Sequence, residues 1–241
     1  MEITLDALKL GKSTIIKDKT YLSTWEYVEP FISQLSKYTN KFICKVQPPK
    51  QLTISNQRED ITYNKVWIQA ILPNNEVYGF VYALDVKTPV FKVYRAYLDP
   101  ETRLTKVFDS NWIQTGLLSP TEKPEFSIQN LMTSTSNIKI KSEVLSNTSF
   151  SLETRDINEF LGRCINRSLL YEYKSIGGKV KISPSCIIKA YQETFNNLEK
   201  SITWSTFYNS LCKEINDDKD LVNIFEKTLL IGMLFDLVEN D

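Results

Sequence analysis

The side chains best suited to chemistry in this chain are lysines, arginines, tyrosines and carboxylates, because its 241 residues include no histidine. Without an imidazole the chain cannot form a Ser-His-Asp triad, a Cys-His dyad or a histidine-containing zinc site. It also lacks the usual proton shuttle near neutral pH. A histidine-free enzyme would need carboxylates, lysine or tyrosine in a recognisable cluster, and the sequence shows none. We therefore expect no catalytic residues, no metal and no other cofactor.

The most suggestive pattern interleaves aromatic and basic side chains along one predicted strand. Such a strand can stack bases while it holds phosphates, as proteins that bind single-stranded nucleic acid do. Side chains in a strand alternate between its faces, however, so Phe91, Arg95 and Tyr97 would face away from Lys92 and Tyr94. A half-buried sheet under helices would explain most of them equally well. The candidate nucleic-acid-binding residues are Lys87, Phe91, Lys92, Tyr94, Arg95, Tyr97 and Lys106, with Trp67, Tyr78 and Tyr82 on neighbouring strands.

Three short patterns resemble anion or metal sites, and each has a simpler structural explanation. Gly11-Lys12-Ser13-Thr14 matches the end of a phosphate-binding loop, but that motif needs a glycine where Asp6 stands. Gly177-Gly178-Lys179 is explained as the terminator of a helix. Asp217-Asp218-Lys219-Asp220 lacks the spacing of a calcium loop and fits a helix start, where the helix dipole favours acidic residues.

Charge and composition favour a water-soluble protein that does not coat duplex DNA. The chain has 29 basic and 29 acidic residues, whereas duplex-binding proteins are usually strongly basic. It has no run of about 18 apolar residues and no signal peptide, so we expect no membrane partner. The cysteines form no C-x-x-C pair and are expected to be reduced; they are Cys44, Cys164, Cys186 and Cys212.

Hydrophobic periodicity predicts an α+β fold with an N-terminal helix and an antiparallel β-meander, followed by a C-terminal helical cluster. Residues 1–22 look extended or irregular. Ser23-Thr24-Trp25-Glu26 is a capping box, which predicts a helix. Pro30 either kinks a helix that begins at Ser23 or lies in the first turn of one that begins near Val28, and both alternatives predict an end near Tyr38. Strands are predicted over 65–72, 77–85, 90–98 and 104–108, joined by short turns that favour an antiparallel meander.

The second half of the chain is predicted to be mainly helical. Pro120 and Pro124 mark residues 119–136 as a linker or long loop. Ile138–Lys141 alternates and is compatible with one more strand. Helices are predicted from Asp156 to Gly177-Gly178, from Pro184, over 204–215 and over 220–239. The chain accordingly divides into residues 1–118, the linker, and residues 137–241, although one continuous domain is also possible.

Two stretches resemble hypothetical proteins of tailed bacteriophages that infect Bacteroidota, including crAss-like phages. They are Ile61–Leu72 and the run from Val93–Leu98 to Val107–Trp112. The order of meander, aromatic/Asn segment and helical tail is similar to the phage/plasmid-like family called domain of unknown function 932. Asp109-Ser110-Asn111 stands where that family has Cys-Thr/Ser-Asn, without the cysteine. The resemblance implies a phage origin and transfers no catalytic residue.

Taken together, the sequence predicts a non-enzymatic bacteriophage protein that acts by binding. It would be a virion component or an accessory factor in the cytoplasm of the infected host cell. A protein partner or self-association is expected. The alternative is a single-stranded DNA-binding or annealing protein of phage replication or recombination, which would use the basic and aromatic residues named above.

Overall fold

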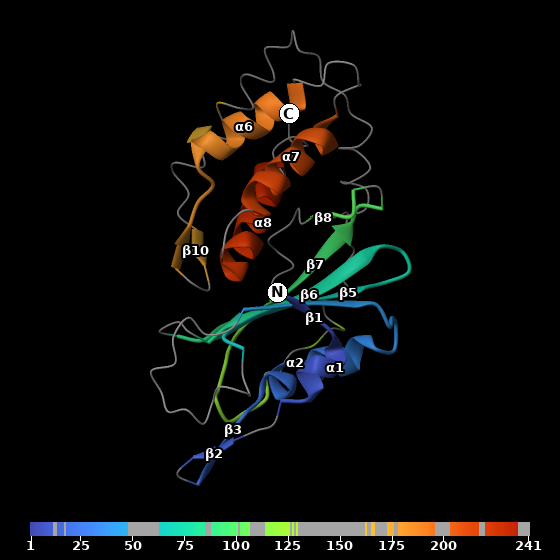
Figure 1. Ribbon diagram of the computed structural model, residues 1–241, viewed down its shortest axis with the longest axis vertical. Helices are drawn as coiled ribbons and strands as arrows, with labels where there is room; N and C mark the ends of the chain where they lie inside the picture. The colour runs from blue at the N-terminus through green and yellow to red at the C-terminus, as the bar shows by residue number, and fades with distance from the viewer. Residues whose placement is uncertain are drawn as a thin grey trace. The chain divides into compact units, whose positions relative to one another are not determined.

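The structure is a computed structural model of the chain, and it describes part of the 241 residues. The described residues are 1–11, 14–16, 18–47, 63–84, 88–100, 102–106, 114–125, 127, 129, 162, 165–166, 173–175, 178–195, 203–216 and 220–235. They form an α+β fold, as predicted, with an antiparallel sheet, N-terminal helices and C-terminal helices (Figure 1).

The described residues among the first 22 form short elements that the sequence analysis did not predict. They contain strand β1 (Glu2–Ile3), helix α1 (Leu5–Lys9) and a hairpin of β2 (Thr14–Ile16) and β3 (Lys19–Tyr21). Helix α1 begins where the Thr4 hydroxyl accepts a hydrogen bond from the Ala7 amide at 3.2 Å. These elements are two to five residues long, too short for hydrophobic periodicity to reveal them.

Helix α2 (Thr24–Leu35) begins at the predicted capping box. The Ser23 hydroxyl accepts from the Glu26 amide at 3.3 Å, and the Glu26 carboxylate accepts from the Ser23 amide at 2.7 Å. Pro30 lies inside the helix. The helix buries Tyr27, Val28, Phe31, Ile32 and Leu35 on one side.

The sheet contains the predicted meander and extends beyond it. Its order is β1-β4-β5-β6-β7-β8, and β9 also pairs with β7. The strands are β4 (Phe42–Gln47), β5 (Lys65–Ile71), β6 (Glu76–Ala83), β7 (Val90–Leu98), β8 (Thr105–Lys106) and β9 (Gln114–Leu117). The turn between β5 and β6 uses Asn75 at φ 64°, as the Pro-Asn-Asn sequence favours.

Helices α1 and α2 lie against one face of the sheet (Figure 1). Alternate residues of the strands meet them, including Val66 and Ile68 of β5, Phe80 of β6 and Phe91 of β7. The Phe80 and Phe91 rings stack at 5.6 Å between centroids, and Phe80 also contacts Phe31 of α2 at 5.5 Å. This core fixes which side chains occupy the opposite face of the sheet.

The later part of the chain contains helices α6 (Pro184–Phe195), α7 (Trp204–Asn216) and α8 (Leu221–Phe235), close to the predicted ranges. The prediction that Gly177-Gly178 ends a helix was wrong. Ser175 pairs with Gly178 in a hairpin of β10 (Tyr173–Ser175) and β11 (Gly178–Val180). The predicted helix from Asp156 lies mostly outside the described residues.

The chain forms two compact units, each built from stretches that interleave along the sequence. Unit 1 contains Met1–Arg95, Trp112–Thr135 and Asp220–Val222; unit 2 contains Ala96–Asn111, Ser136–Lys219 and Asn223–Asp241. The boundary passes through β7, between Arg95 and Ala96. Among the helices that are described, none has the length and apolarity that a bilayer crossing requires.

Candidate functional site

The predicted nucleic-acid-binding residues do not form one exposed surface. The six that are described have exposed fractions between 0% and 8%, and Lys87 lies outside the described residues. Phe91 belongs to the core beneath α2, whereas Tyr94 contacts residues on the opposite face of the sheet. Tyr97 and Lys106 pair across β7 and β8 within unit 2. The strand alternation that the sequence predicted therefore separates these side chains.

Tyr94 instead forms a bridge across three strands of unit 1. Its ring lies over Gly79 of β6, where an added Cβ would stand 2.0 Å from the ring. Beyond the glycine, the Tyr94 hydroxyl oxygen accepts hydrogen bonds from Trp67 Nε1 at 2.5 Å and from Gln69 Nε2 at 3.1 Å. Gln69 is paired with Gly79 across β5 and β6, so the missing side chain opens the path that the ring takes.

The chemistry available to the Tyr94 bridge is that of a neutral phenol. Burial raises the pKa of Tyr94 above its ordinary value of 10.0, although the hydrogen bonds from Trp67 and Gln69 act in the opposite direction. A phenol held in this form acts as a hydrogen-bonding group and not as a base near neutral pH. The bridge therefore satisfies the buried Trp67 and Gln69 donors and ties β5 to β7.

Two buried basic side chains of the sheet in unit 1 form ion pairs with carboxylates. Arg95 forms an ion pair with Glu76 at 2.8 Å, and its guanidinium lies 5.7 Å from the Tyr78 ring centroid. Lys65 pairs with Asp220, and the other carboxylate oxygen of Asp220 accepts from the Val222 amide at 3.0 Å. Asp220 thus caps α8, in agreement with the helix-start explanation of its acidic run; residues 217–219 lie outside the described residues.

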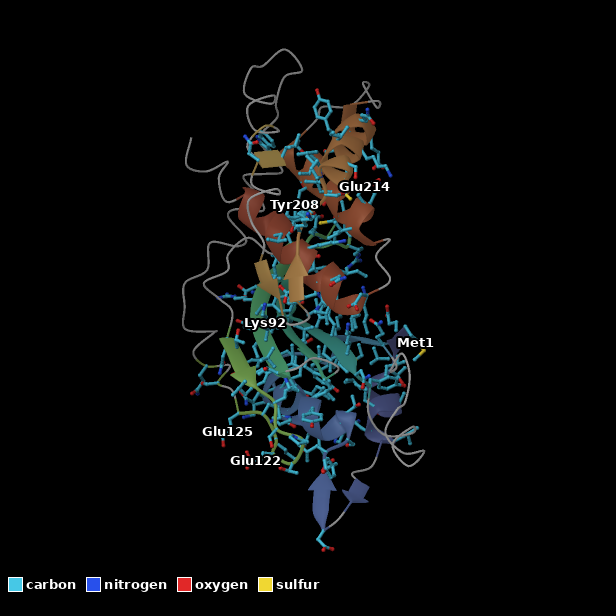
Figure 2. All side chains as sticks on the ribbon, turned by 90° about the vertical axis from the view of Figure 1, so that its left-hand side faces the viewer. Met1, Lys92, Glu122, Glu125, Tyr208 and Glu214 are labelled. Carbon is cyan, nitrogen blue, oxygen red and sulfur yellow. The ribbon has the colours of Figure 1, made fainter. Side chains whose placement is uncertain are left out.

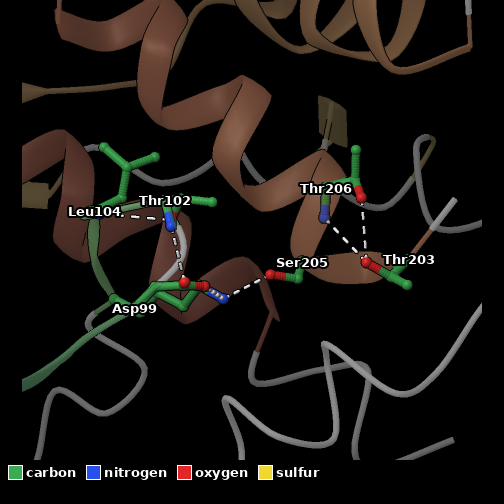
Figure 3. A network of polar contacts seen from close by, with 7 residues as sticks. Asp99, Thr102, Leu104, Thr203, Ser205 and Thr206 are labelled. Atoms are coloured by element: carbon green, nitrogen blue, oxygen red, sulfur yellow. Dashed lines mark hydrogen bonds and ion pairs between the residues drawn. The ribbon is translucent and has the colours of Figure 1, made fainter. Parts of the chain in front are cut away.

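Unit 2 contains a second polar cluster, centred on Lys106. This side chain is fully buried and forms an ion pair with Asp99 at 2.7 Å. It also donates to the Ser205 hydroxyl at 2.6 Å and lies 5.9 Å from the centroid of the Tyr208 ring. Figure 3 shows Asp99 also accepting from the Thr102 amide, at 3.1 Å, and Ser205 in the first turn of α7.

A lysine beside a serine can activate the hydroxyl as a nucleophile, provided that the amine is neutral. In this cluster the Lys106 side chain forms an ion pair with the Asp99 carboxylate, and the Ser205 side chain is buried as well. The ammonium donates to the hydroxyl oxygen and does not accept its proton. The contacts therefore describe a structural ion pair that joins the end of β7, β8 and α7.

Two buried cysteines are kept in the thiol form. Burial raises the pKa of Cys44 from 9.0 to about 11 and the pKa of Cys212 to about 12. Cys44, Cys186 and Cys212 are free thiols, as expected, and Cys164 lies outside the described residues. In the parts of the chain that are described, no three acidic or cysteine side chains group as ligands for a metal ion.

The sequence analysis missed an exposed edge of the sheet at β9. The amide of Leu118 donates to the carbonyl of Pro89 at 2.9 Å, next to the paired residues Leu117 and Val90. Hydrogen-bonded and non-hydrogen-bonded pairs alternate in an antiparallel ladder. The backbone groups of Gly116 therefore point toward β7, and those of Thr115 and Leu117 point outward. Among the described residues, no strand pairs with this outer side of β9.

A groove of about 730 Å³ lies beside this edge in unit 1. It is lined by β9, Phe91, Ser119 and the segment from Glu122 to Glu125. The side chains of Glu122 and Glu125 lie together beyond the end of β9, on the outside of the chain (Figure 2). The sequence signal for this groove was weak. Strand β9 has only four residues, and Pro124 marked the segment from Glu122 to Glu125 as part of a linker.

Comparisons of this chain with protein-family models, with curated proteins and with solved structures found no match.

Proposed function

We propose that this chain is a non-enzymatic bacteriophage protein that acts by binding another protein, as a virion component or as an accessory factor in the infected cell. The phage origin is supported by the resemblance of residues 61–72 and 93–112 to tailed-phage proteins. The binding role is supported by one structural observation, the outer edge of β9. A strand edge with outward backbone donors and acceptors can pair with a strand of another chain.

The geometry of β9 suits the addition of a strand from a partner. Thr115 and Leu117 direct backbone donors and acceptors outward, and their side chains are exposed. In strand addition the main-chain hydrogen bonds supply affinity and the neighbouring side chains supply specificity. The groove along β9 provides space for such side chains.

The arrangement of the buried ionisable groups also favours binding over catalysis. Lys106, Arg95 and Lys65 are each held by a carboxylate, and the Cys44 and Cys212 thiols are shielded. Groups held in this way stabilise the fold and are poorly placed to react with a substrate. The exposed features of β9 then become the best supported functional surface.

The proposal is tested by capturing partners with the wild-type protein and two variants at Thr115. In Thr115→Pro the outward amide is lost while the hydrogen bonds of β9 to β7 remain, since proline is tolerated at such edge positions. Thr115→Ser keeps the amide and serves as the matched control. A protein that is retained by the wild type and by Thr115→Ser, but lost from Thr115→Pro, supports the proposal. Equal retention by the wild type and both variants contradicts a role for the edge.

Two further measurements distinguish a virion component from an accessory factor, and a different protein partner from a second copy of this chain. Detection of the chain in purified virions supports a structural role, and its presence only in infected cells supports an accessory role. Light scattering shows whether the captured partner is a second copy of the chain. If the wild type has the mass of a dimer and Thr115→Pro has the mass of a monomer, the partner at β9 is a second copy of this chain.

A further inference from the structure

We propose that the groove beside β9 selects an extended protein segment that carries lysine or arginine at alternate positions. This inference rests on the proposed function and specifies the chemistry of its partner. It follows from the backbone groups of β9, the side chains around them and the charges at the end of the groove.

The backbone of β9 determines that the partner segment is extended. Thr115 and Leu117 are two residues apart, so their outward amides and carbonyls repeat with the period of a strand. An added strand would continue the sheet beyond β7 and β9. Because β9 has only four residues, the contact would be short and the binding weak or transient.

The side chains of β9 differ between its two faces. Thr115 and Leu117 are exposed on one face, and 73% of the surface of Leu117 is accessible. On the other face Gly116 leaves room for the Phe91 ring, since an added Cβ at Gly116 would lie 2.4 Å from that ring. A bound strand with alternating side chains would place one set on the face of Thr115 and Leu117 and the other on the face of Gly116 and Phe91; residues of both faces line the groove.

The charges of the groove indicate that the partner is basic. Glu122, Lys123 and Glu125 are exposed, and Lys123 forms an ion pair with Glu29 of α2 at 2.5 Å. This pair offsets the positive charge of Lys123 and leaves the two carboxylates of Glu122 and Glu125 at the groove. Carboxylates next to a strand edge attract lysine and arginine and repel acidic segments.

The test measures the binding of two labelled peptides to the full chain by fluorescence anisotropy. Each peptide has ten residues, and every second residue is valine. The remaining residues are lysine in one peptide and glutamate in the other. We expect the lysine peptide to bind and the glutamate peptide to bind much more weakly. The protein variant Glu122→Gln with Glu125→Gln should weaken binding of the lysine peptide about threefold to tenfold, because each exposed ion pair contributes modestly.

A matched control separates local from global charge. Asp6→Asn with Glu193→Gln also removes two negative charges, but from exposed positions elsewhere in the chain, and should leave the affinity unchanged. Added salt should weaken binding of the lysine peptide to the wild type more than to the Glu122/Glu125 variant. Equal loss of affinity in both double variants would overturn selection by the groove.

Hydrogen exchange tests the position of the peptide without relying on a variant that must fold. Binding of the lysine peptide should slow exchange of the Thr115 and Leu117 amides, because these donors would become hydrogen-bonded. Equally slowed exchange with both peptides would overturn the basic preference and leave strand addition at β9 intact. Peptide binding without such protection, or no binding at all, would overturn this inference; the capture experiment with Thr115→Pro would then decide the proposed function separately.

Discussion

The ring of Tyr94 occupies the space that a side chain at Gly79 would fill, with only 2.0 Å between the ring and an added Cβ. Glycine at this position is therefore a requirement of packing, and its φ needs no special conformation. Tyr94, which the sequence analysis placed among the candidate nucleic-acid-binding residues, therefore contributes to the packing of the sheet.

We expect Gly79→Ala to destabilise the protein by about 1–3 kcal/mol, because the methyl group and the Tyr94 ring cannot both be accommodated. The free energy of unfolding would be measured in urea, with tryptophan fluorescence as the signal. In a Tyr94→Ala background the same substitution should cost much less, because the clashing ring is gone. An equal cost in both backgrounds would show that the ring does not occupy this space.

Replacement of Lys106 by methionine should destabilise the protein by about 3–5 kcal/mol, because Asp99 would lose the partner of its largely buried charge. Combining Lys106→Met with Asp99→Asn should cost less than the sum of the two single changes. Lys123→Met, at the exposed ion pair with Glu29, is the control and should cost less than about 1 kcal/mol. Thermal unfolding of the four variants distinguishes a structural ion pair from a dispensable one.

Stability should fall at alkaline pH. The pKa of Cys44 is about 11 and that of Cys212 about 12 in the folded chain, above the ordinary value of 9.0. The unfolded state therefore loses these protons first, so the free energy of unfolding decreases as pH rises above about 9 and levels off above the folded pKa values. Buried Tyr82 and Tyr94 act in the same direction, since their pKa values are also raised.

The variant Cys44→Ala with Cys212→Ala should show a shallower decrease between pH 9 and 11. Urea unfolding at several pH values provides the measurement. At pH 8 a thiol-alkylating reagent should modify Cys186 of the native protein, which is only partly buried, before Cys44 or Cys212. Rapid native-state labelling of Cys44 or Cys212 at that pH would contradict the shielding.

Lys92→Ala with Arg95→Ala should lower stability and leave any binding of single-stranded DNA unchanged. Lys92 and Arg95 have exposed fractions of 5% and 7%, and Arg95 has Glu76 as its partner. Titration of a labelled oligonucleotide at low salt, alongside urea unfolding, gives both readouts. Wild-type binding that weakens steeply with salt and disappears in this variant would restore the nucleic-acid hypothesis.

The elements that the sequence predicted best are those with a complete local signal. The capping box at Ser23 and Glu26 located the start of α2, and alternating aromatic and β-branched residues gave β7 its observed bounds. The N-terminal elements and β9 were missed because each is too short to show a period.

The candidate site was harder to predict, because its character depends on distant contacts. No local pattern indicates that Lys106 is fully buried against Asp99 and Ser205, a residue 99 positions away. The groove at β9 likewise joins Phe91 to Glu122 and Glu125, which are separated along the chain and meet only after the sheet forms. Sequence patterns identify residue types and elements, whereas exposure at a sheet edge is a property of the folded molecule.

The passage of β7 from one unit into the other limits how the molecule can be dissected. A fragment that ends at Arg95 would truncate this strand after six of its nine residues and would omit β9, the neighbour of its first half. Shortening the gene from either end therefore removes strands or helix residues that unit 1 requires. Unit 1 alone would instead require the removal of residues 96–111 and 136–219 from within the chain, with new linkers joining the ends that remain.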